Sequence, residues 1–311
     1  LKKRQLAYFD EDMAELQSRR FPYEYNVFDK DETRELLGSD MYVGSMTNMR
    51  NGHVHPLNLC IGEAEAAIKL GARIFEQSPV TEIIHGNKPI VKTAHGQVQA
   101  DAVVLAGNAY HRLERKHLSG LTFPAGSYMI GTQPLPKEVL EEINPRDLAV
   151  CDLNEIVDYH RISADGRMLY GGRCNYSGRE PASIKGSILP RMLNVYPQLE
   201  DFKIDFEWGG NIGIVLNRIP ALGRINGNVW YSQGYSGHGV NVSHIMGEVI
   251  SDAISGSMEK FDLYAKVKHH RIPGGRWLGN QTIALGMLYF RIVLFTVEGD
   301  TPNFSDTSAI L

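Results

Sequence analysis

The chain has 311 residues, of which 43% are hydrophobic and 22% charged, and its formal net charge is −4. This length and composition allow a large buried core and predict two lobes, and a charge so close to neutral speaks against nucleic acid or an anionic membrane as a partner. The three cysteines, Cys60, Cys151 and Cys174, lie far apart and form no C-x-x-C pair. We therefore predict a cytoplasmic protein with neither a disulfide framework nor a zinc site.

The N-terminal segment has the pattern of a charged helix, with Leu6, Phe9, Met13 and Leu16 on one side. Because the chain begins at Leu1 rather than at methionine, we expect it to be a fragment of a longer protein.

A second helix is predicted over residues 57–70. Apolar side chains recur there at helical spacing, and Gly71 stands where a helix usually ends. Cys60 falls on the apolar side, so we expect it in the core. The preceding His53-x-His55 pair has no third ligand at a suitable spacing, so we predict no metal site.

Short strands are predicted next, at 72–75, 80–84, 89–94 and 97–100, the last two as a hairpin. The continuous apolar run 101–107 predicts a strand covered on both faces. Ala106 and Gly107 end this run, and open α/β sheets bind their ligands at that carboxyl edge.

The middle of the chain predicts a separate antiparallel sheet inserted into the first lobe. Its strands are expected at 127–135, 159–162, 168–172 and 204–208, with a tight turn at Asp165-Gly166 and a helix over 183–195.

A glycine-rich loop, residues 234–241, follows an apolar strand at 228–232 and leads into a helix over 242–254. Its glycines allow a close approach of the backbone to a ligand, and the helix N-terminus favours a polar or anionic group there. The spacing is not G-x-G-x-x-G, because position 242 is Val, so a merely tight turn remains the alternative. Near the end, the apolar run 282–297 carries Arg291 and predicts a packed helix rather than a membrane span.

Several groups of residues occur in an order that is typical of one family. They are His55-Pro56, Gly71-Ala72 with Val80, 102–107, Thr132-Gln133-Pro134-Leu135, Tyr159-x-Arg161 with Gly171-Gly172, Trp208-x-Gly210 and 234–240. In this order they resemble the FAD-dependent D-amino-acid-oxidase-type superfamily. Within it, the chain is most similar to the gamma-glutamylputrescine oxidases and related amine oxidases.

The resemblance implies a mixed α/β fold in which a split, Rossmann-like FAD-binding lobe carries an inserted antiparallel-sheet substrate lobe. The implied divisions are a helical segment and substrate-lobe start (1–49), the FAD lobe in two parts (50–125 and 209–258), the substrate sheet (126–208) and a C-terminal helix and tail (259–311). The family's first βαβ unit, with its G-x-G-x-x-G turn, is absent from this sequence.

The resemblance also implies functional residues. Those expected to bind FAD are Val80, Ala106, Gly107, Asn108, Gly209, Gly234, Gly237, His238, Gly239 and Val240. Those expected to bind substrate are Tyr159, Arg161, Trp208 and Tyr235, and His238 and Tyr159 are the catalytic candidates.

Some of these residues have a second interpretation. Strand alternation places Tyr159 and Arg161 on the same face, where Arg161 fits either a substrate carboxylate or a structural ion pair. Trp208 fits the core as well as a pocket wall. His238, between two glycines, has a flavin or substrate role or a structural one.

The implied reaction is the FAD-dependent oxidation of a small primary or secondary amine, gamma-glutamylputrescine-like and belonging to putrescine catabolism. The amine becomes an imine and then an aldehyde, and O2 becomes hydrogen peroxide. Two alternatives remain: a sarcosine- or D-amino-acid-oxidising enzyme, and a catalytically inactive, truncated remnant.

Overall fold

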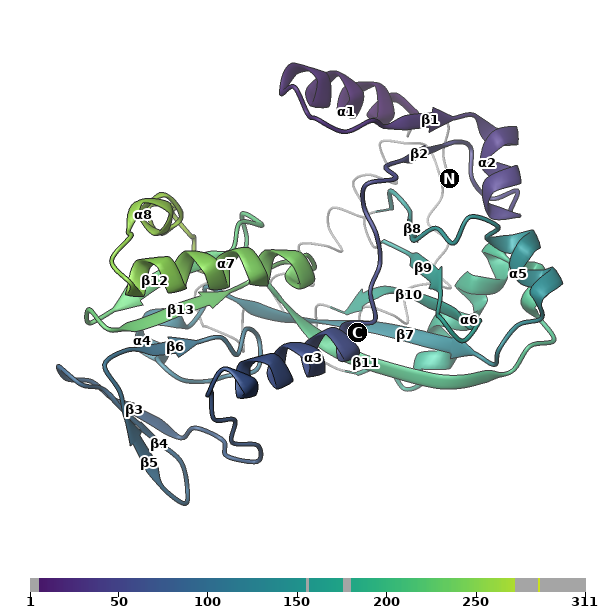
Figure 1. Ribbon diagram of the computed structural model, residues 1–311. Coiled ribbons are helices and arrows are strands. Elements are labelled where there is room, and N and C mark those ends of the chain that lie inside the picture. Colours follow the sequence, from purple (N-terminus) through teal and green to yellow (C-terminus); the bar gives the residue numbers. More distant parts are fainter. Residues whose placement is uncertain (1–5, 155–156, 176–179, 272–284, 286–311) are drawn as a thin grey trace. The chain divides into compact units, whose positions relative to one another are not determined.

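The computed structural model describes residues 6–154, 157–175, 180–271 and 285 (Figure 1). The chain divides into two compact units. Unit 1 takes residues 1–59, 127–174 and 181–210, and unit 2 takes 60–126, 175–180 and 211–311. The predicted mixture of helices with antiparallel sheets is confirmed. The helix predicted over 282–297 lies outside the described residues, apart from residue 285.

Unit 1 is built on a five-stranded sheet in the order β11-β7-β10-β9-β8. The strands are β7 (Phe123–Thr132), β8 (Val150–Cys151), β9 (Tyr159–Ile162), β10 (Met168–Asn175) and β11 (Ile204–Ile214). The predicted turn joins β9 to β10, with Gly166 at φ 79°. Three strands differ from prediction in length: β7 begins and ends earlier, and β10 and β11 continue further, because their ladders run past the apolar segments that marked them.

Helices cover one face of this sheet. They are α2 (Lys30–Leu37), α5 (Lys137–Ile143), α6 (Ile184–Val195) and the short η2 (Pro197–Leu199). Their apolar side chains pack against Ile130, Met168 and Tyr170, which are fully buried. A capping box between Asp29 and Glu32 starts α2. Helix α1 (Leu6–Ser18) and a hairpin of β1 (Asn26–Phe28) and β2 (Ser45–Thr47) complete unit 1.

Unit 2 contains two three-stranded sheets. One has the order β12-β13-β6, from β12 (Ala221–Ile225), β13 (Val229–Gln233) and β6 (Val103–Leu105), and β13 and β6 run parallel. The other is a meander of β3 (Glu82–Ile84), β4 (Ile90–Lys92) and β5 (Gln97–Gln99), which confirms the predicted hairpin. The helices of unit 2 are α3 (Pro56–Lys69), α4 (Arg115–Leu118), α7 (Gly239–Ile254) and α8 (Glu259–Ala265).

Helix α7 packs along β12 and β13, with Met246, Val249 and Ile250 buried against Leu222 and Trp230 (Figure 1). It begins at Gly239, three residues before the predicted start, so the glycine loop is shorter than expected.

Four expectations about burial and strands were wrong. Helix α3 begins and ends one residue before the predicted 57–70 and buries no residue, and Cys60 is exposed rather than in the core. The run ending at Gly107 is not covered on both faces, because Val104 is 44% exposed. Residues 72–75 form no strand.

Candidate functional site

The first part of the site is an edge of unit 2. Strands β6 and β13 are parallel neighbours, with Val103 opposite Val229 and Leu105 opposite Tyr231. Their carboxyl ends therefore meet at the same edge, where Ala106-Gly107 follows β6 and Gly234 follows β13. This is the edge at which parallel sheets bind ligands.

Asn108 joins the two loops at this edge. It has φ 45°, a left-handed conformation that asparagine tolerates, and its Oδ1 accepts a hydrogen bond of 2.9 Å from the Gly234 amide. Gly213 lies so close to this side chain that a β-carbon there would overlap it. The Ser236 amide also donates to the Gly213 carbonyl at 2.8 Å. The glycine loop is therefore held in one conformation by β11.

The start of α7 is open to a ligand. Gly237 has φ 98°, and a side chain there would meet nothing within 4 Å. His238 is the exposed N-cap residue, no side chain of the described residues caps this end, and Val240 is 53% exposed. The first-turn amides and the positive end of the helix dipole thus remain for a polar or anionic group. Together with the loop after β6, these residues fit the polar edge of a flavin.

Two predicted cofactor glycines have a packing explanation. A β-carbon on Gly234, at φ 79°, would overlap the Val215 side chain. Gly209 lies in unit 1 against the ring of Tyr128, on the helix-covered face of the sheet. Tyr235 is half-buried and its hydroxyl pairs with Ser232 Oγ at 2.9 Å, and burial raises its pKa.

Val80 lies outside any strand, two residues before β3, and is 38% exposed. Nothing in the described residues places it next to the glycine loop.

The second part of the site is the uncovered face of the unit 1 sheet, which we call the open face. In β9, Tyr159 and Arg161 are half-buried on it, while His160 and Ile162 point into the core. Phe206 and Trp208 extend the face across β11 at 54% and 42% exposed, so Trp208 is not a core residue. The structure thus brings three of the four predicted substrate residues onto one face.

Two residues of the open face are held by neighbours. Tyr159 lies over Gly171, and its hydroxyl shares a 2.8 Å hydrogen bond with Ser127 Oγ. Arg161 donates to the Val54 carbonyl at 3.1 Å and pairs with His53 Nδ1 at 3.1 Å. These contacts favour a positioning role for Arg161, and a direct contact with a substrate carboxylate stays a prediction.

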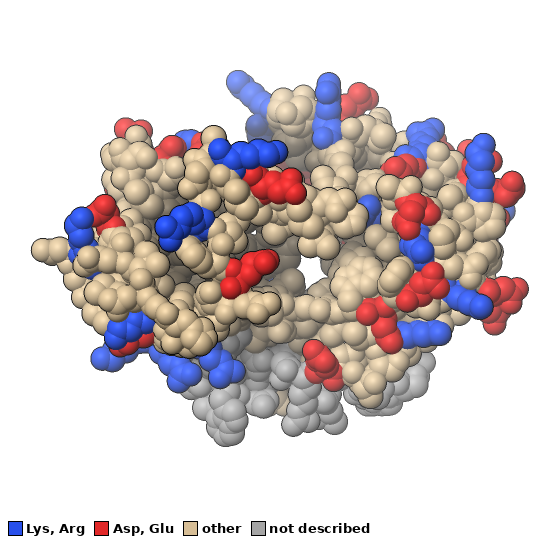
Figure 2. Space-filling view, turned by 60° about the horizontal axis from the view of Figure 1, so that its bottom comes forward, with Lys and Arg blue, Asp and Glu red and all other residues tan. Residues whose placement is uncertain are grey.

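The described part of the chain contains neither a candidate metal site nor a candidate membrane-spanning helix. No group of three or more His, Cys, Asp or Glu residues there could hold a metal ion, and no helix there could cross a bilayer. On the face shown in Figure 2, acidic and basic side chains are interspersed, in keeping with the net charge of −4.

Comparison with known proteins identifies the family. The model of the family "DAO: FAD dependent oxidoreductase" matches residues 2–253. The chain belongs to this family of FAD-dependent oxidoreductases. The predictions of an oxidoreductase and of FAD as its cofactor are therefore confirmed.

The relatives agree with this assignment. The chain is 38% identical over 291 residues to gamma-glutamylputrescine oxidoreductase of Escherichia coli K12, covering 91% of this chain and 68% of that protein. It is 36% identical to a probable oxidoreductase, OrdL, of Haemophilus influenzae, covering 91% and 67%. It thus spans about two thirds of the length of these relatives.

Among solved structures, L-proline dehydrogenase from P. horikoshii superposes with a TM-score of 0.69 over 82% of this chain and 70% of that chain. Because the sequences are 21% identical, this likeness concerns the fold.

Sequence reasoning missed some features of this candidate site. Phe206 shares the face of Trp208, and the two-residue spacing within a strand was the signal that could have found it. The contacts of Ser236 with Gly213 and of Arg161 with Val54 join distant segments, and no local pattern announces them.

Proposed function

We propose that the protein oxidises an aliphatic amine related to gamma-glutamylputrescine, with O2 as the electron acceptor. The observation that carries the proposal is the 38% identity to gamma-glutamylputrescine oxidoreductase over 91% of the chain. In the proposed reaction, R-CH2-NH2 loses two electrons and two protons to become R-CH=NH, and O2 becomes hydrogen peroxide. Water then releases the aldehyde and ammonia.

Bound FAD supplies the two-electron acceptor for this chemistry. The amides at the start of α7, from Gly239 and Val240, would hold its polar edge, and Gly107 would let it approach β6 closely. His238, exposed at the helix start, is our candidate for contact with flavin or substrate.

The open face would orient the amine. Tyr159, Phe206 and Trp208 offer apolar and aromatic surface, which disfavours the charged ammonium and so favours the neutral amine that can be oxidised. Arg161 would act by holding the segment at His53 and Val54 in place. Two unpaired cysteines, Cys60 and Cys151, support a location in a reducing compartment such as the cytoplasm.

The test is a comparison of substrates with flavin-loaded protein, measured as hydrogen peroxide formation. We expect gamma-glutamylputrescine to be oxidised with a higher kcat/KM than sarcosine, glycine or D-alanine. A preference for the amino acids would favour a glycine-oxidase-like function instead. If flavin-loaded protein turned over none of these compounds, the proposed amine oxidation would be wrong.

A further inference from the structure

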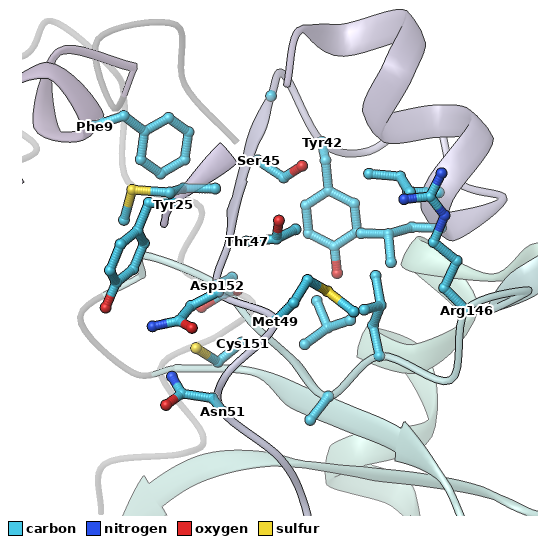
Figure 3. Close-up of a pocket in the computed structure, with 18 of the residues that line it drawn as sticks. Phe9, Tyr25, Tyr42, Ser45, Thr47, Met49, Asn51, Arg146, Cys151 and Asp152 are labelled. Atoms are coloured by element: carbon cyan, nitrogen blue, oxygen red, sulfur yellow. The ribbon is translucent and has the colours of Figure 1, made fainter. Parts of the chain in front are cut away.

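Unit 1 contains a pocket that none of the predicted site residues lines (Figure 3). Its volume is about 620 Å³, within the range of small-molecule sites. Aromatic and thioether side chains form much of its wall, namely Phe9, Tyr25, Tyr42, Met46 and Met49. Residues of α1, of the end of α2, of β2 and of the edge strand β8 line it, and Leu36, Leu37 and Tyr42 belong both to its wall and to the helix-covered core.

The pocket adjoins the open face. Cys151, in its wall, is the direct partner of Tyr159 across the antiparallel β8–β9 pair, and such partners project to the same side of a sheet. His53, also in the wall, pairs with Arg161 of the open face at 3.1 Å. A linear molecule on the open face could therefore extend into the pocket without leaving unit 1.

The charge of the pocket is acidic. Asp12, Asp147 and Asp152 line it, against a single arginine, Arg146. Oδ1 of Asp147 lies 3.6 Å from Nε2 of His53. Asp152 is held by neutral donors, namely the backbone amides of Asn154 at 3.1 Å and Asp158 at 3.0 Å and the side-chain amide of Asn154 at 2.5 Å, and no ion pair to it occurs within the described residues.

Burial raises the pKa of Asp152 above its usual value, more than these hydrogen bonds lower it. A desolvated carboxylate without a counter-charge is a place where a bound cation is stabilising.

Tyr42 forms a rigid part of the pocket wall. Its hydroxyl shares a 3.0 Å hydrogen bond with Nε2 of the buried His160, and the His160 ring stacks on Tyr170 at 5.4 Å. A preformed apolar wall together with an acidic group suits an alkyl chain that ends in an ammonium, because the wall packs against the methylenes and the carboxylate pairs with the charge.

We propose that this pocket binds the cationic end of the amine substrate that is not oxidised. The inference rests on the proposed function and adds a substrate class to it: linear aliphatic amines with a second, positively charged nitrogen, which in gamma-glutamylputrescine is the α-ammonium and not the amide. An ammonium paired with Asp152 keeps its proton, and a protonated amine cannot be oxidised, so the reacting nitrogen lies at the other end, on the open face. The pocket would thus select diamines and diamine derivatives over simple alkylamines.

The test uses Cys151 as a reporter in the purified protein. Modification by N-ethylmaleimide is followed by mass spectrometry of tryptic peptides, because residues 147–161 carry Cys151 and residues 51–69 carry Cys60. We expect 1,4-diaminobutane to slow the modification of Cys151 and to leave that of Cys60 unchanged. The neutral isostere 1,4-butanediol should protect neither thiol. Unchanged or faster modification of Cys151 at saturating diamine overturns the proposal.

Two variants test the charge. Asp152→Asn keeps an acceptor for the neighbouring amides but removes the negative charge, and should weaken protection by the diamine about tenfold. Asp201→Asn, on an exposed turn of the same unit, is the matched control and should change nothing.

Because Asp152 also holds a turn, a second variant that leaves Asp152 in place is needed. Asn51 is exposed at the pocket wall. Asn51→Lys adds a positive charge there and should weaken binding of the diamine, whereas Asn51→Gln should not. Protection that survives both Asp152→Asn and Asn51→Lys contradicts cation binding in this pocket.

The failure of this inference is distinguishable from the failure of the proposed function. If the diamine derivative reduces the flavin but does not protect Cys151, the oxidase function stands and the pocket is not its binding site. If Cys151 is protected but no amine reduces the flavin, the pocket binds cations and the proposed oxidation is wrong.

Discussion

Replacement of Asn108 by alanine should loosen the cofactor edge of unit 2 and lower the stability of that unit. The change removes the acceptor of the Gly234 amide, which at 2.9 Å is a part-buried hydrogen bond, and an unsatisfied buried amide costs about 1–3 kcal/mol. Alanine also lacks the polar side chain that lets asparagine tolerate the left-handed conformation at φ 45°, which costs about 1 kcal/mol more. The expected loss is therefore about 2–4 kcal/mol.

Two further substitutions at the same position separate these contributions. Asn108→Gly loses the hydrogen bond but relieves the backbone, so it should fall between alanine and wild type. Asn108→Asp keeps an acceptor and a residue that tolerates this conformation, so it should stay close to wild type. Urea unfolding gives the order, and the retained flavin absorbance shows whether the loop still holds cofactor. If Asn108→Ala were as stable as Asn108→Asp, the hydrogen bond to Gly234 would have no part in holding the loop.

Three other perturbations follow from the structure. Burial lowers the pKa of His160 to about 4. The free energy of unfolding should therefore fall by up to about 3 kcal/mol as pH drops from about 6.5 toward 4. In urea unfolding, His160→Gln should lack this fall in stability. His244 of α7 pairs with Glu63 of α3, and this carboxylate raises the pKa of His244. The contribution of the pair to stability should be present at low pH and lost as pH rises through the raised pKa. In thermal unfolding, Glu63→Gln should abolish this pH dependence. Arg161→Ala removes the exposed hydrogen bond to the Val54 carbonyl and should destabilise unit 1 by about 0.5–1.5 kcal/mol. It should slow turnover of acidic and simple amines equally, whereas a loss confined to acidic substrates would show direct pairing with a substrate carboxylate.

Much of the local structure was predictable because it depends on short-range signals. The hairpin of β4 and β5, the turn at Asp165-Gly166 and the helix after Ser183 follow from turn residues, strand alternation and an N-cap. The position of the glycine loop after a strand and before a helix was likewise predicted. Each of these features is decided within a few residues of chain.

Burial was less predictable because it depends on what packs against a segment. The apolar spacing of α3 predicted a buried face, yet none of its residues is buried in the described structure. Gly209 looked like a glycine that admits a cofactor, but the approaching group is the ring of Tyr128 from a neighbouring strand. In the same way, the acidic pocket beside Cys151 joins residues 6–53 to residues 146–153, which no sequence spacing reveals.

The central claim is that this chain, once loaded with FAD, is reduced by an aliphatic amine. The most direct test is an anaerobic titration of the flavin-loaded protein with gamma-glutamylputrescine, followed by absorbance in the blue. We predict that the oxidised flavin band disappears as the amine is added and returns when O2 is admitted. A flavin band that stays unchanged at saturating amine, in protein that is folded by circular dichroism, would contradict the proposed amine oxidation.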